Sequence, residues 1–319
     1  MKLTRTKLTK IAAAFTLAAF AAILIAFPNR YLSVCFDGLC LWAECVLPSL
    51  FPFMVITLLL IKMGAAQAAA KPFTKLLNVF KLPAAAAPLF VMSVFSGYPA
   101  GSRILNEYCD LGLIDQTQAK KLAPLCSTCG PLFALGTVGI KAFGGNGAGV
   151  KLFCACIISV TLSSLIYSLF TKRAATGIAI KSAAKQTDAL YSAFYGAVNA
   201  SLVAGGFICF FYTLSKVIAD FYIFMPLIYA LSPLFGGELA SGLSAGLCEA
   251  TGGCFALAAT GGFFALPLAG FLITFGGASI LFQQLCYLGK CKVKAGFFVL
   301  FKFIQGVICF ALLCLFSLW

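Results

Sequence analysis

Long apolar runs separated by short polar loops make up most of the sequence. The first run covers residues 11–27 and follows several basic residues, and because no small-residue cleavage motif comes after it, we expect an uncleaved membrane helix. Further runs extend over about residues 39–61, 83–105, 122–140, 150–170, 188–218, 221–234, 238–258, 262–287 and 295–318. A helix needs about 20 apolar residues to cross a bilayer. The pattern therefore predicts an all-α, polytopic membrane protein.

Composition and charge support this prediction. Hydrophobic residues form 62% of the chain and charged residues 10%, whereas about 25% of the residues in soluble domains are charged. The formal net charge is +14, but the basic residues stand singly or in small groups between apolar runs, where they orient membrane helices. They form no arm or stripe that could bind nucleic acid. We therefore expect no nucleic-acid partner, a multi-pass membrane protein, and a cytoplasmic N-terminus.

Side chains typical of enzymes are missing from the sequence. It contains no histidine, which excludes histidine-ligated metals and histidine-based triads. Cys126 and Cys129 form a C-x-x-C pair, but a zinc site of that type would need a second pair. There is no nucleophile elbow and no cofactor loop. We expect no enzymatic activity, no metal and no cofactor, apart from a Na⁺ or H⁺ that could couple transport.

Two of the apolar runs contain glycine-rich interruptions. The stretch "SGYPAG" begins at Ser96 and places two glycines and a proline inside one run, and "CEATGG" places Glu249 and two glycines inside another. A broken helix in lipid leaves backbone N–H and C=O groups without partners, so such breaks persist only where protein or a water-filled cavity covers them. We predict two broken helices that meet around a cavity near the bilayer centre.

Two other runs have centres that contain proline or polar residues. The first carries Pro48, Ser49 and Pro52, and the second carries Asn199 and Ser201 followed by paired glycines. Each pattern predicts two half-length helices that meet at an irregular tip. This arrangement is a re-entrant hairpin, which enters and leaves the membrane on one side.

The order of these features repeats along the chain. Each half contains a hairpin, a broken helix and a second helix with a glycine-containing interruption, and the spacing between corresponding features is nearly constant. The aligned pairs are Ser49 with Ser201, Ser96 with Glu249, and Thr128 with Phe275. Basic residues place the two hairpins on opposite sides, so the repeats are predicted to be inverted. Inverted repeats with broken helices are typical of secondary transporters.

This reasoning divides the chain into three segments. Residues 1–30 are predicted to form an N-terminal transmembrane helix, residues 31–187 a first repeat, and residues 188–319 a second repeat that ends in a C-terminal transmembrane helix. The predicted fold class is therefore all-α, with two inverted repeats that each contain a re-entrant hairpin and a broken transmembrane helix.

The motifs "VLPSLFPF", "SGYPAGSRI", "STCGPLFALGTVG", "NASLVAGGFICFF", "CEATGG" and "FGGASILFQQ" occur in an order that resembles one known family. It is the family of YlbJ-type sporulation integral membrane proteins, with its relatives of the nucleoside-recognition (Gate) domain. The resemblance covers roughly residues 35–315. It implies a fold similar to concentrative nucleoside transporters, in which two opposed hairpins and two unwound helices enclose a solute site coupled to Na⁺ or H⁺. The sporulation relatives further imply dipicolinate as the solute.

The resemblance also assigns positions within this sequence. It places Pro48 and Ser49 at the first tip, Asn199 and Ser201 at the second, Ser96, Gly97, Tyr98 and Pro99 in one unwound segment, and Glu249, Thr251 and Gly252 in the other. The run "STCGP" departs from the asparagine-rich pattern of the family, because Cys129 stands where a polar side chain is expected.

Glu249 is the strongest single candidate for the site. It is the only acid between Leu239 and Pro267, and a carboxyl group near mid-membrane costs about 2.5–3.5 kcal/mol on insertion scales, so it should face the interior. Tyr98 could stack on a planar ligand or anchor the helix at the interface. Arg103 could pair with a ligand carboxylate or extend to the cytoplasmic surface.

The complete set of candidate site residues also includes residues at the second interrupted helix of each half and a glutamine near the end of the penultimate apolar run. It comprises Pro48, Ser49, Ser96, Gly97, Tyr98, Pro99, Arg103, Ser127, Thr128, Asn199, Ser201, Glu249, Thr251, Gly252, Gly276 and Gln283. Glu44 and Gln284 are weaker candidates, because Glu44 could lie at the interfacial end of the first hairpin and Gln284 could form an interhelix hydrogen bond.

Three functions remain open from the sequence. The first is a secondary transporter of a small polar or anionic solute, with dipicolinate during sporulation as one cargo. The second is a nucleoside permease coupled to sodium or protons, and the third is a membrane scaffold or sensor that transports nothing. The expected partners are a small-molecule solute and the lipid bilayer, and a homo-oligomer is left open.

Overall fold

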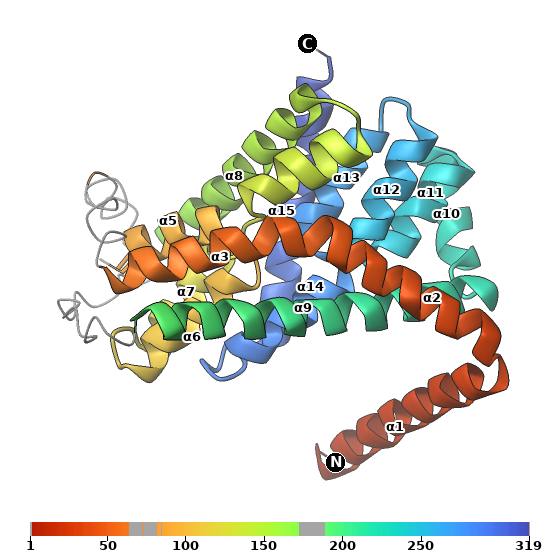
Figure 1. Ribbon diagram of the computed structural model, residues 1–319, viewed down its shortest axis with the longest axis horizontal. Helices are drawn as coiled ribbons and strands as arrows, with labels where there is room; N and C mark the ends of the chain where they lie inside the picture. The colour runs from red at the N-terminus through yellow and green to blue at the C-terminus, as the bar shows by residue number, and fades with distance from the viewer. Residues whose placement is uncertain (1, 64–71, 73–81, 84, 172–188, 319) are drawn as a thin grey trace.

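The computed structural model describes residues 2–63, 72, 82–83, 85–171 and 189–318, and these ranges contain helices and no strands (Figure 1). The predicted all-α fold class is thereby confirmed. The helices are α1 (Lys2–Ala26), α2 (Pro28–Leu41), the π-helix η1 (Trp42–Val46), α3 (Leu47–Lys62), α5 (Ala86–Ser96), α6 (Ala100–Asp110), α7 (Gln116–Leu125), the π-helix η2 (Phe133–Ala142), α8 (Asn146–Leu169), α9 (Ala189–Asp220), α10 (Met225–Phe235), α11 (Gly237–Gly246), α12 (Ala250–Thr260), α13 (Ala265–Phe275), α14 (Gly277–Leu288) and α15 (Ala295–Phe316).

The described helices occur in a repeated order. In the first half a long helix (α2, η1 and α3) is followed by two interrupted helices, α5/α6 and α7/η2, and by α8. In the second half α9 is followed by α10, by the interrupted helices α11/α12 and α13/α14, and by α15. The predicted boundary at residues 187/188 lies outside the described residues. The inverted relation of the two halves stays a prediction.

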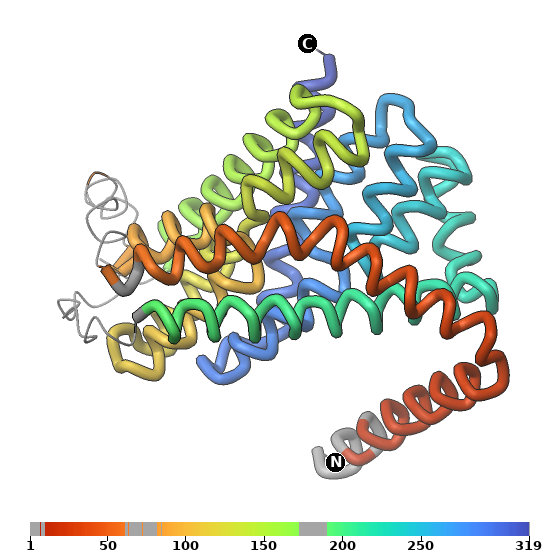
Figure 2. The backbone as a smooth tube through the Cα atoms, viewed as in Figure 1, coloured from red at the N-terminus to blue at the C-terminus, as the bar shows by residue number. Residues whose placement is uncertain are grey.

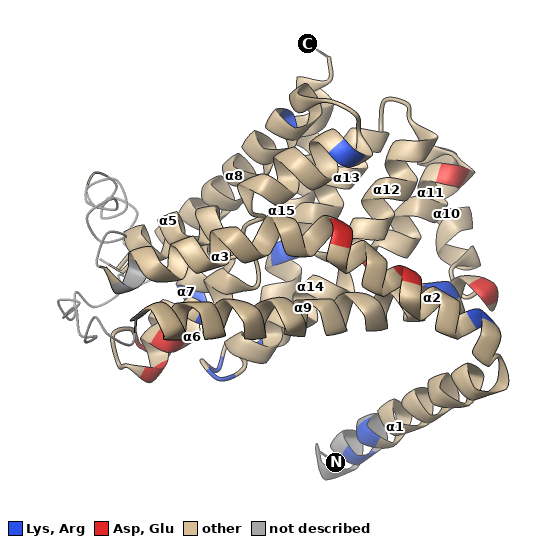
Figure 3. Cartoon of the chain, viewed as in Figure 1, with Lys and Arg blue, Asp and Glu red and all other residues tan. Residues whose placement is uncertain are grey.

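Five helical stretches of the described chain are long and apolar enough to cross a membrane. They are Pro28–Leu60, Asn146–Leu169, Leu190–Asp220, Ala265–Leu288 and Ala295–Phe316. The helical body carries few charged residues (Figure 3). Helix α1 extends away from this body (Figure 2) and contacts α9 through the rings of Phe20 and Phe210, whose centroids lie 5.5 Å apart.

The two predicted re-entrant hairpins are wrong. Residues 28–60 and 190–220 each form one helical stretch without a turn at the expected tips. The two long helices run antiparallel, as the contacts between their opposite ends require. The Tyr31 hydroxyl donates to Asp220 Oδ2 at 3.0 Å, and at the other end the rings of Phe51 and Phe194 lie 6.5 Å apart.

Neighbouring side chains explain why Pro48 does not break the first long helix. Proline lacks an N–H group, so a proline inside a helix leaves a carbonyl one turn earlier without its usual donor. Before Pro48, Lys141 Nζ donates to the carbonyl of Glu44 at 2.9 Å, and Thr137 Oγ1 donates to that of Cys45 at 2.7 Å. The π-helical turn η1 widens the helix at this point. The carbonyls next to Pro48 are satisfied inside the protein, and the helix continues.

In α9, Gly196 and Gly205 allow close packing against side chains of other helices. A Cβ atom at Gly205 would lie 2.7 Å from the indole of Trp42, so the glycine allows η1 to approach α9. A Cβ atom at Gly196 would similarly lie 2.7 Å from the guanidinium of Arg103. Small residues on one face of a membrane helix permit such contacts without breaking the helix.

Candidate functional site

The first pair of interrupted helices meets at two glycines. Helix α5 ends at Ser96, and Gly97 follows with φ +69° and ψ −174°, a conformation that is essentially restricted to glycine. A Cβ atom at Gly97 would lie 2.5 Å from the backbone nitrogen of Gly130, in the segment between α7 and η2. Thr128 Oγ1 donates to the carbonyl of Ser93 at 2.7 Å. The break in α5/α6, predicted from the sequence, is confirmed, and it packs against the break in α7/η2.

The second pair of interrupted helices is joined by main-chain hydrogen bonds. The N–H groups of Ala278 and Ser279, at the start of α14, donate to the carbonyls of Leu247 and Cys248 at 2.7 Å and 3.0 Å. These carbonyls lie just after α11, so two broken ends satisfy each other within the protein. The break between α13 and α14 lies at Gly276, whose φ of +102° is left-handed.

The break in α11/α12 begins slightly earlier than its predicted position. Helix α11 ends at Gly246 and α12 begins at Ala250, so Thr251 and Gly252 lie in the first turn of α12. The chain resumes its helix at this point because the side chain of Glu249 accepts hydrogen bonds from the free N–H groups of that turn.

Glu249 is therefore both a buried acid and a helix cap. Its side chain is only 2% exposed. Its Oε1 accepts from the backbone N–H of Thr251 at 3.0 Å, and its Oε2 accepts from that of Gly252 at 2.6 Å. The positive end of the dipole of α12 also stabilises a negative charge at this position. This arrangement provides the partner that the sequence argument required for an acid near mid-membrane.

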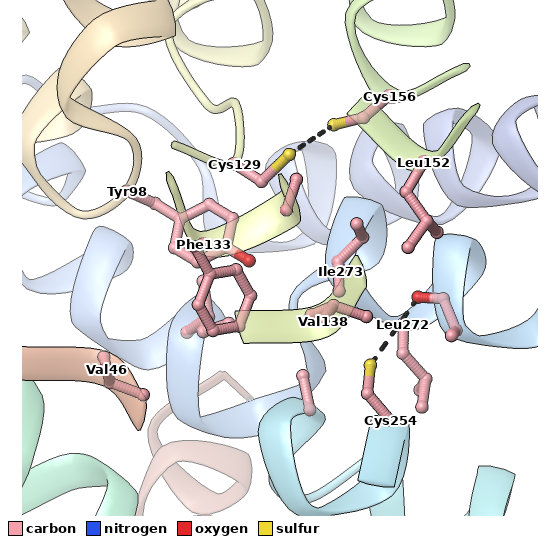
Figure 4. Packing of buried hydrophobic residues seen from close by; sticks show 14 of the residues in the cluster. Val46, Tyr98, Cys129, Phe133, Val138, Leu152, Cys156, Cys254, Leu272 and Ile273 are labelled. Carbon is pink, nitrogen blue, oxygen red and sulfur yellow. Dashed lines mark hydrogen bonds between the residues drawn. The ribbon is translucent and has the colours of Figure 1, made fainter. Parts of the chain in front are cut away.

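A closed inner cavity lies between the two pairs of breaks. Its volume is about 10 Å³, which leaves room for no more than about one water molecule. The lining residues are Val46, Leu50, Tyr98, Phe133, Ala204, Ile208, Glu249, Thr251, Ile280 and Gln283. The rings of Tyr98 and Phe133 meet edge to face at 6.3 Å (Figure 4), and the Tyr98 hydroxyl has no hydrogen-bond partner. The two long helices and the breaks thus surround one small space.

A larger outer cavity adjoins the inner one. It has a volume of about 500 Å³ and lies among α9, α11 and α12. Exposed side chains at its rim include Lys216, Glu238 and Thr260, while Glu249 and Gly252 lie on its wall. Glu249 is the one residue common to the linings of the two cavities. Glu249, at the break before α12, therefore lies between an outer cavity with an exposed rim and an inner cavity lined by buried residues.

The structure brings most, but not all, of the sequence-predicted residues together. Tyr98, Glu249, Thr251 and Gln283 line the inner cavity. Others are buried in or near the breaks and on the long helices without lining that cavity, namely Ser49, Ser96, Gly97, Pro99, Ser127, Thr128, Ser201 and Gly276. Gly252 lines the outer cavity.

Three candidates lie apart from both cavities. Pro48 and Asn199 are exposed on the long helices, as is Glu44. Arg103 is held elsewhere, because its Nη1 donates to the carbonyl of Gly196 at 2.5 Å and its Nη2 lies 3.7 Å from Glu107 Oε1. In this conformation Arg103 is paired within the protein and lines neither cavity.

Sequence reasoning missed two groups of residues. The apolar lining, such as Leu50 and Ile208, carried no signal, because apolar side chains in a membrane helix are expected at every position. Lys302 did carry a signal. It is a lysine inside the apolar helix α15, and its side chain is 1% exposed.

The fold and the covered breaks define a class of protein, namely an integral membrane protein built from α-helices. Within that class, the chain is 29% identical over 137 residues to the sporulation integral membrane protein YlbJ of Bacillus subtilis (strain 168). The alignment covers 42% of this chain and spans 33% of the length of that relative. This match confirms the resemblance to YlbJ-type proteins. No protein-family model and no solved structure matches the chain, so the nucleoside-recognition part of the resemblance stays a prediction.

Proposed function

We propose that the protein is a secondary transporter of a small polar or anionic solute that works by alternating access. The observation that carries this proposal is the position of Glu249, which lines both the accessible outer cavity and the closed inner one. Broken helices around a central cavity are the usual architecture of such a site. A solute that enters the outer cavity reaches the break before α12 first.

Movement of the half-helices would open the inner cavity. At about 10 Å³ it is too small for any solute, so transport requires the breaks to separate. Helix α12 is linked to α11 by a short non-helical segment, and the N–H groups of its first turn are held by the Glu249 side chain. A half-helix held in this way can tilt without breaking a continuous ladder of backbone hydrogen bonds.

Two classes of solute would use these groups differently. An anionic solute such as dipicolinate would meet Lys216 at the rim and would have to displace the Glu249 carboxylate from the N-terminus of α12. A nucleoside would instead donate hydroxyl groups to that carboxylate. The coupling ion of either cargo would be Na⁺ or H⁺, and the bacterial membrane would be its site of action.

Gln283 provides a direct test of the inner cavity. It lines the cavity, while the adjacent Gln284 is buried away from it and accepts a hydrogen bond from Ser102 Oγ at 3.2 Å. We expect Gln283→Leu to lower solute uptake by about tenfold or more, because it removes a polar group that faces the solute. The matched control Gln284→Leu should retain uptake per folded molecule. Proteoliposomes supplied with pyridine-2,6-dicarboxylate or uridine provide the measurement.

Either of two results would contradict the proposal. If the wild-type protein moves neither probe nor any other small polar solute, a scaffold or sensor function would replace transport. If Gln284→Leu lowers uptake as much as Gln283→Leu, the inner cavity would not be the solute site. Size-exclusion profiles of both variants would establish that equal amounts of folded protein are compared.

A further inference from the structure

Lys302 is a buried cation at the end of a broken helix. It lies on α15, and its Nζ donates to the carbonyl of Ser127 at 2.8 Å. Ser127 is the second residue after α7, next to its C-cap Cys126, so this carbonyl lies close to the negative end of a half-helix dipole. Ser127 is itself fully buried, and its hydroxyl has no hydrogen-bond partner. The ammonium therefore occupies the kind of position in which a transporter binds a coupling cation, namely the unwound carbonyls of a broken helix.

A neighbouring side chain shows that hydrogen bonding alone does not require a charge here. Gln305 lies one turn further along α15, and its Nε2 donates to the carbonyl of Pro124 at 3.2 Å and to Ser163 Oγ at 3.2 Å. The neutral amide of Gln305 thus satisfies the carbonyl of Pro124, which lies in the last turn of α7. A lysine in the membrane interior costs several kcal/mol more than a neutral group when charged. Hydrogen bonding to the end of α7 therefore does not by itself explain why residue 302 is a lysine.

No acid among the described residues neutralises this charge. The ionisable groups that act on Lys302 are the thiols of Cys129, Cys156 and Cys309. Cys129 lies between α7 and η2 and Cys156 on α8, and their sulfur atoms are 3.2 Å apart (Figure 4). Helix α13, which also packs on α15, contains no charged residue.

The charged groups of the other neighbouring helices lie elsewhere. On α7, Lys120 places its ammonium over the ring of Phe297, and Lys121 precedes Ser127 by more than one turn. On α8, Lys151 donates to the carbonyl of Phe316 at the opposite end of α15. Among the described residues, the ionisable neighbours of the Lys302 ammonium are thus the three cysteines and no carboxylate.

We propose that Lys302 is the coupling-proton site of the transporter, and this inference rests on the proposed function. When charged, the ammonium takes the place of a metal cation and holds the broken end of α7 against α15. When it gives its proton to water on the open side, the carbonyl of Ser127 loses its cation, and α7 can separate from α15. Coupling is then to protons and does not involve sodium.

The packing of the breaks provides a route from Lys302 to the inner cavity. The segment that carries Ser127 continues to Gly130, which touches Gly97 of the other break. Tyr98, the next residue, lines the inner cavity. A movement of the α7 end therefore reaches the solute site through two backbone segments that are in direct contact.

Two variants separate a proton site from a structural cap. Arginine stays protonated and glutamine stays neutral, yet both can donate to the carbonyl of Ser127. We expect both variants to lose uptake driven by a pH gradient by about tenfold or more. Exchange of solute across the membrane at equal pH should continue in Lys302→Gln but should also fall in Lys302→Arg, whose permanent charge holds α7 against α15. Uptake by wild-type proteoliposomes should follow the pH gradient and ignore a sodium gradient. Normal pH-driven uptake in both variants, or sodium-driven uptake by the wild type, would overturn the proposal.

A second measurement needs no solute and is independent of the proposed function. The thermal unfolding temperature of the purified protein is compared in sodium chloride and in N-methylglucamine chloride. We expect no sodium effect for the wild type but a rise of a few degrees in sodium for Lys302→Ala, because sodium would bind the vacated carbonyl end and stabilise the protein. Lys302→Leu, which cannot donate a hydrogen bond to the carbonyl of Ser127, serves if the alanine variant does not fold.

The matched control for this measurement is Lys151→Ala. Lys151 also donates to a helix-end carbonyl, that of Phe316 at 2.7 Å, but its side chain is only half-buried. Its removal should create no response to sodium. A sodium effect in the wild type, or its absence in both Lys302 variants, would show that Lys302 does not occupy a cation site, even if solute uptake is observed.

Discussion

Replacing Glu249 with glutamine is expected to lower net solute uptake by about a hundredfold. The amide has one acceptor oxygen in place of two, so it cannot accept from both N–H groups that the carboxylate holds, at 3.0 Å and 2.6 Å. It also lacks the negative charge that the N-terminus of α12 stabilises. Uptake of radiolabelled pyridine-2,6-dicarboxylate and uridine into proteoliposomes would measure the effect.

Solute binding by the same variant distinguishes the two cargo classes. A dicarboxylate should still bind, because the neutral amide does not repel it. A nucleoside should bind much more weakly, because the variant lacks the carboxylate that accepts hydrogen bonds from its hydroxyl groups. Calorimetry of wild type and variant against both probes would record this difference. Glu238→Gln, an exposed carboxylate at the rim of the outer cavity, is the control and should bind and transport normally. Normal transport by Glu249→Gln would remove Glu249 from the mechanism.

Replacing Gly97 with alanine is expected to prevent accumulation of folded protein. The backbone conformation at Gly97 costs about 1–3 kcal/mol for a residue with a side chain. In addition, the new Cβ atom would lie 2.5 Å from the nitrogen of Gly130 and 2.8 Å from its Cα atom, so two backbone segments would have to move apart. Fluorescence-detected size-exclusion chromatography of the detergent-extracted protein would measure the loss.

Gly112 offers a matched control for this variant. Its φ of +67° is nearly the same, but a Cβ atom there would meet nothing within 4 Å. Gly112→Ala should therefore show only the backbone cost, as a modest fall in unfolding temperature. Equal behaviour of the two variants would mean that the breaks at Gly97 and Gly130 do not touch.

The sequence predicted the breaks better than the continuous helices. Gly97 could be recognised because two glycines and a proline in one apolar run leave backbone groups that must be covered. Glu249 could be recognised because an acid in an apolar run needs a partner. Both features are local. Glu249 lines the inner cavity, and Gly97 precedes Tyr98, which also lines it. The order of elements in the two halves followed from the same local signals.

The two hairpins were predicted wrongly because contacts with residues far along the chain decide whether these two runs break or continue as helices. Whether Pro48 breaks its helix depends on Lys141 and Thr137, which supply the missing donors from a helix far along the chain. The glycines of α9 likewise depend on Trp42 and Arg103, against which they pack. Such contacts between distant segments cannot be inferred from the pattern of one run. The apolar part of the cavity lining was beyond prediction for the same reason.

The hydrogen bonds at the two pairs of breaks differ in how easily a side-chain substitution can remove them. In the second half, main-chain groups of Leu247, Cys248, Ala278 and Ser279 bond to each other, and these bonds survive any side-chain replacement that keeps the backbone path. At the breaks of the first half, the side chain of Thr128 and that of Lys302, which comes from α15, make the corresponding contacts. A single codon change can remove or replace them. If transport is ion-coupled as proposed, substitutions that change the driving ion are therefore easier at the first pair of breaks, while the second pair is less sensitive to side-chain substitution.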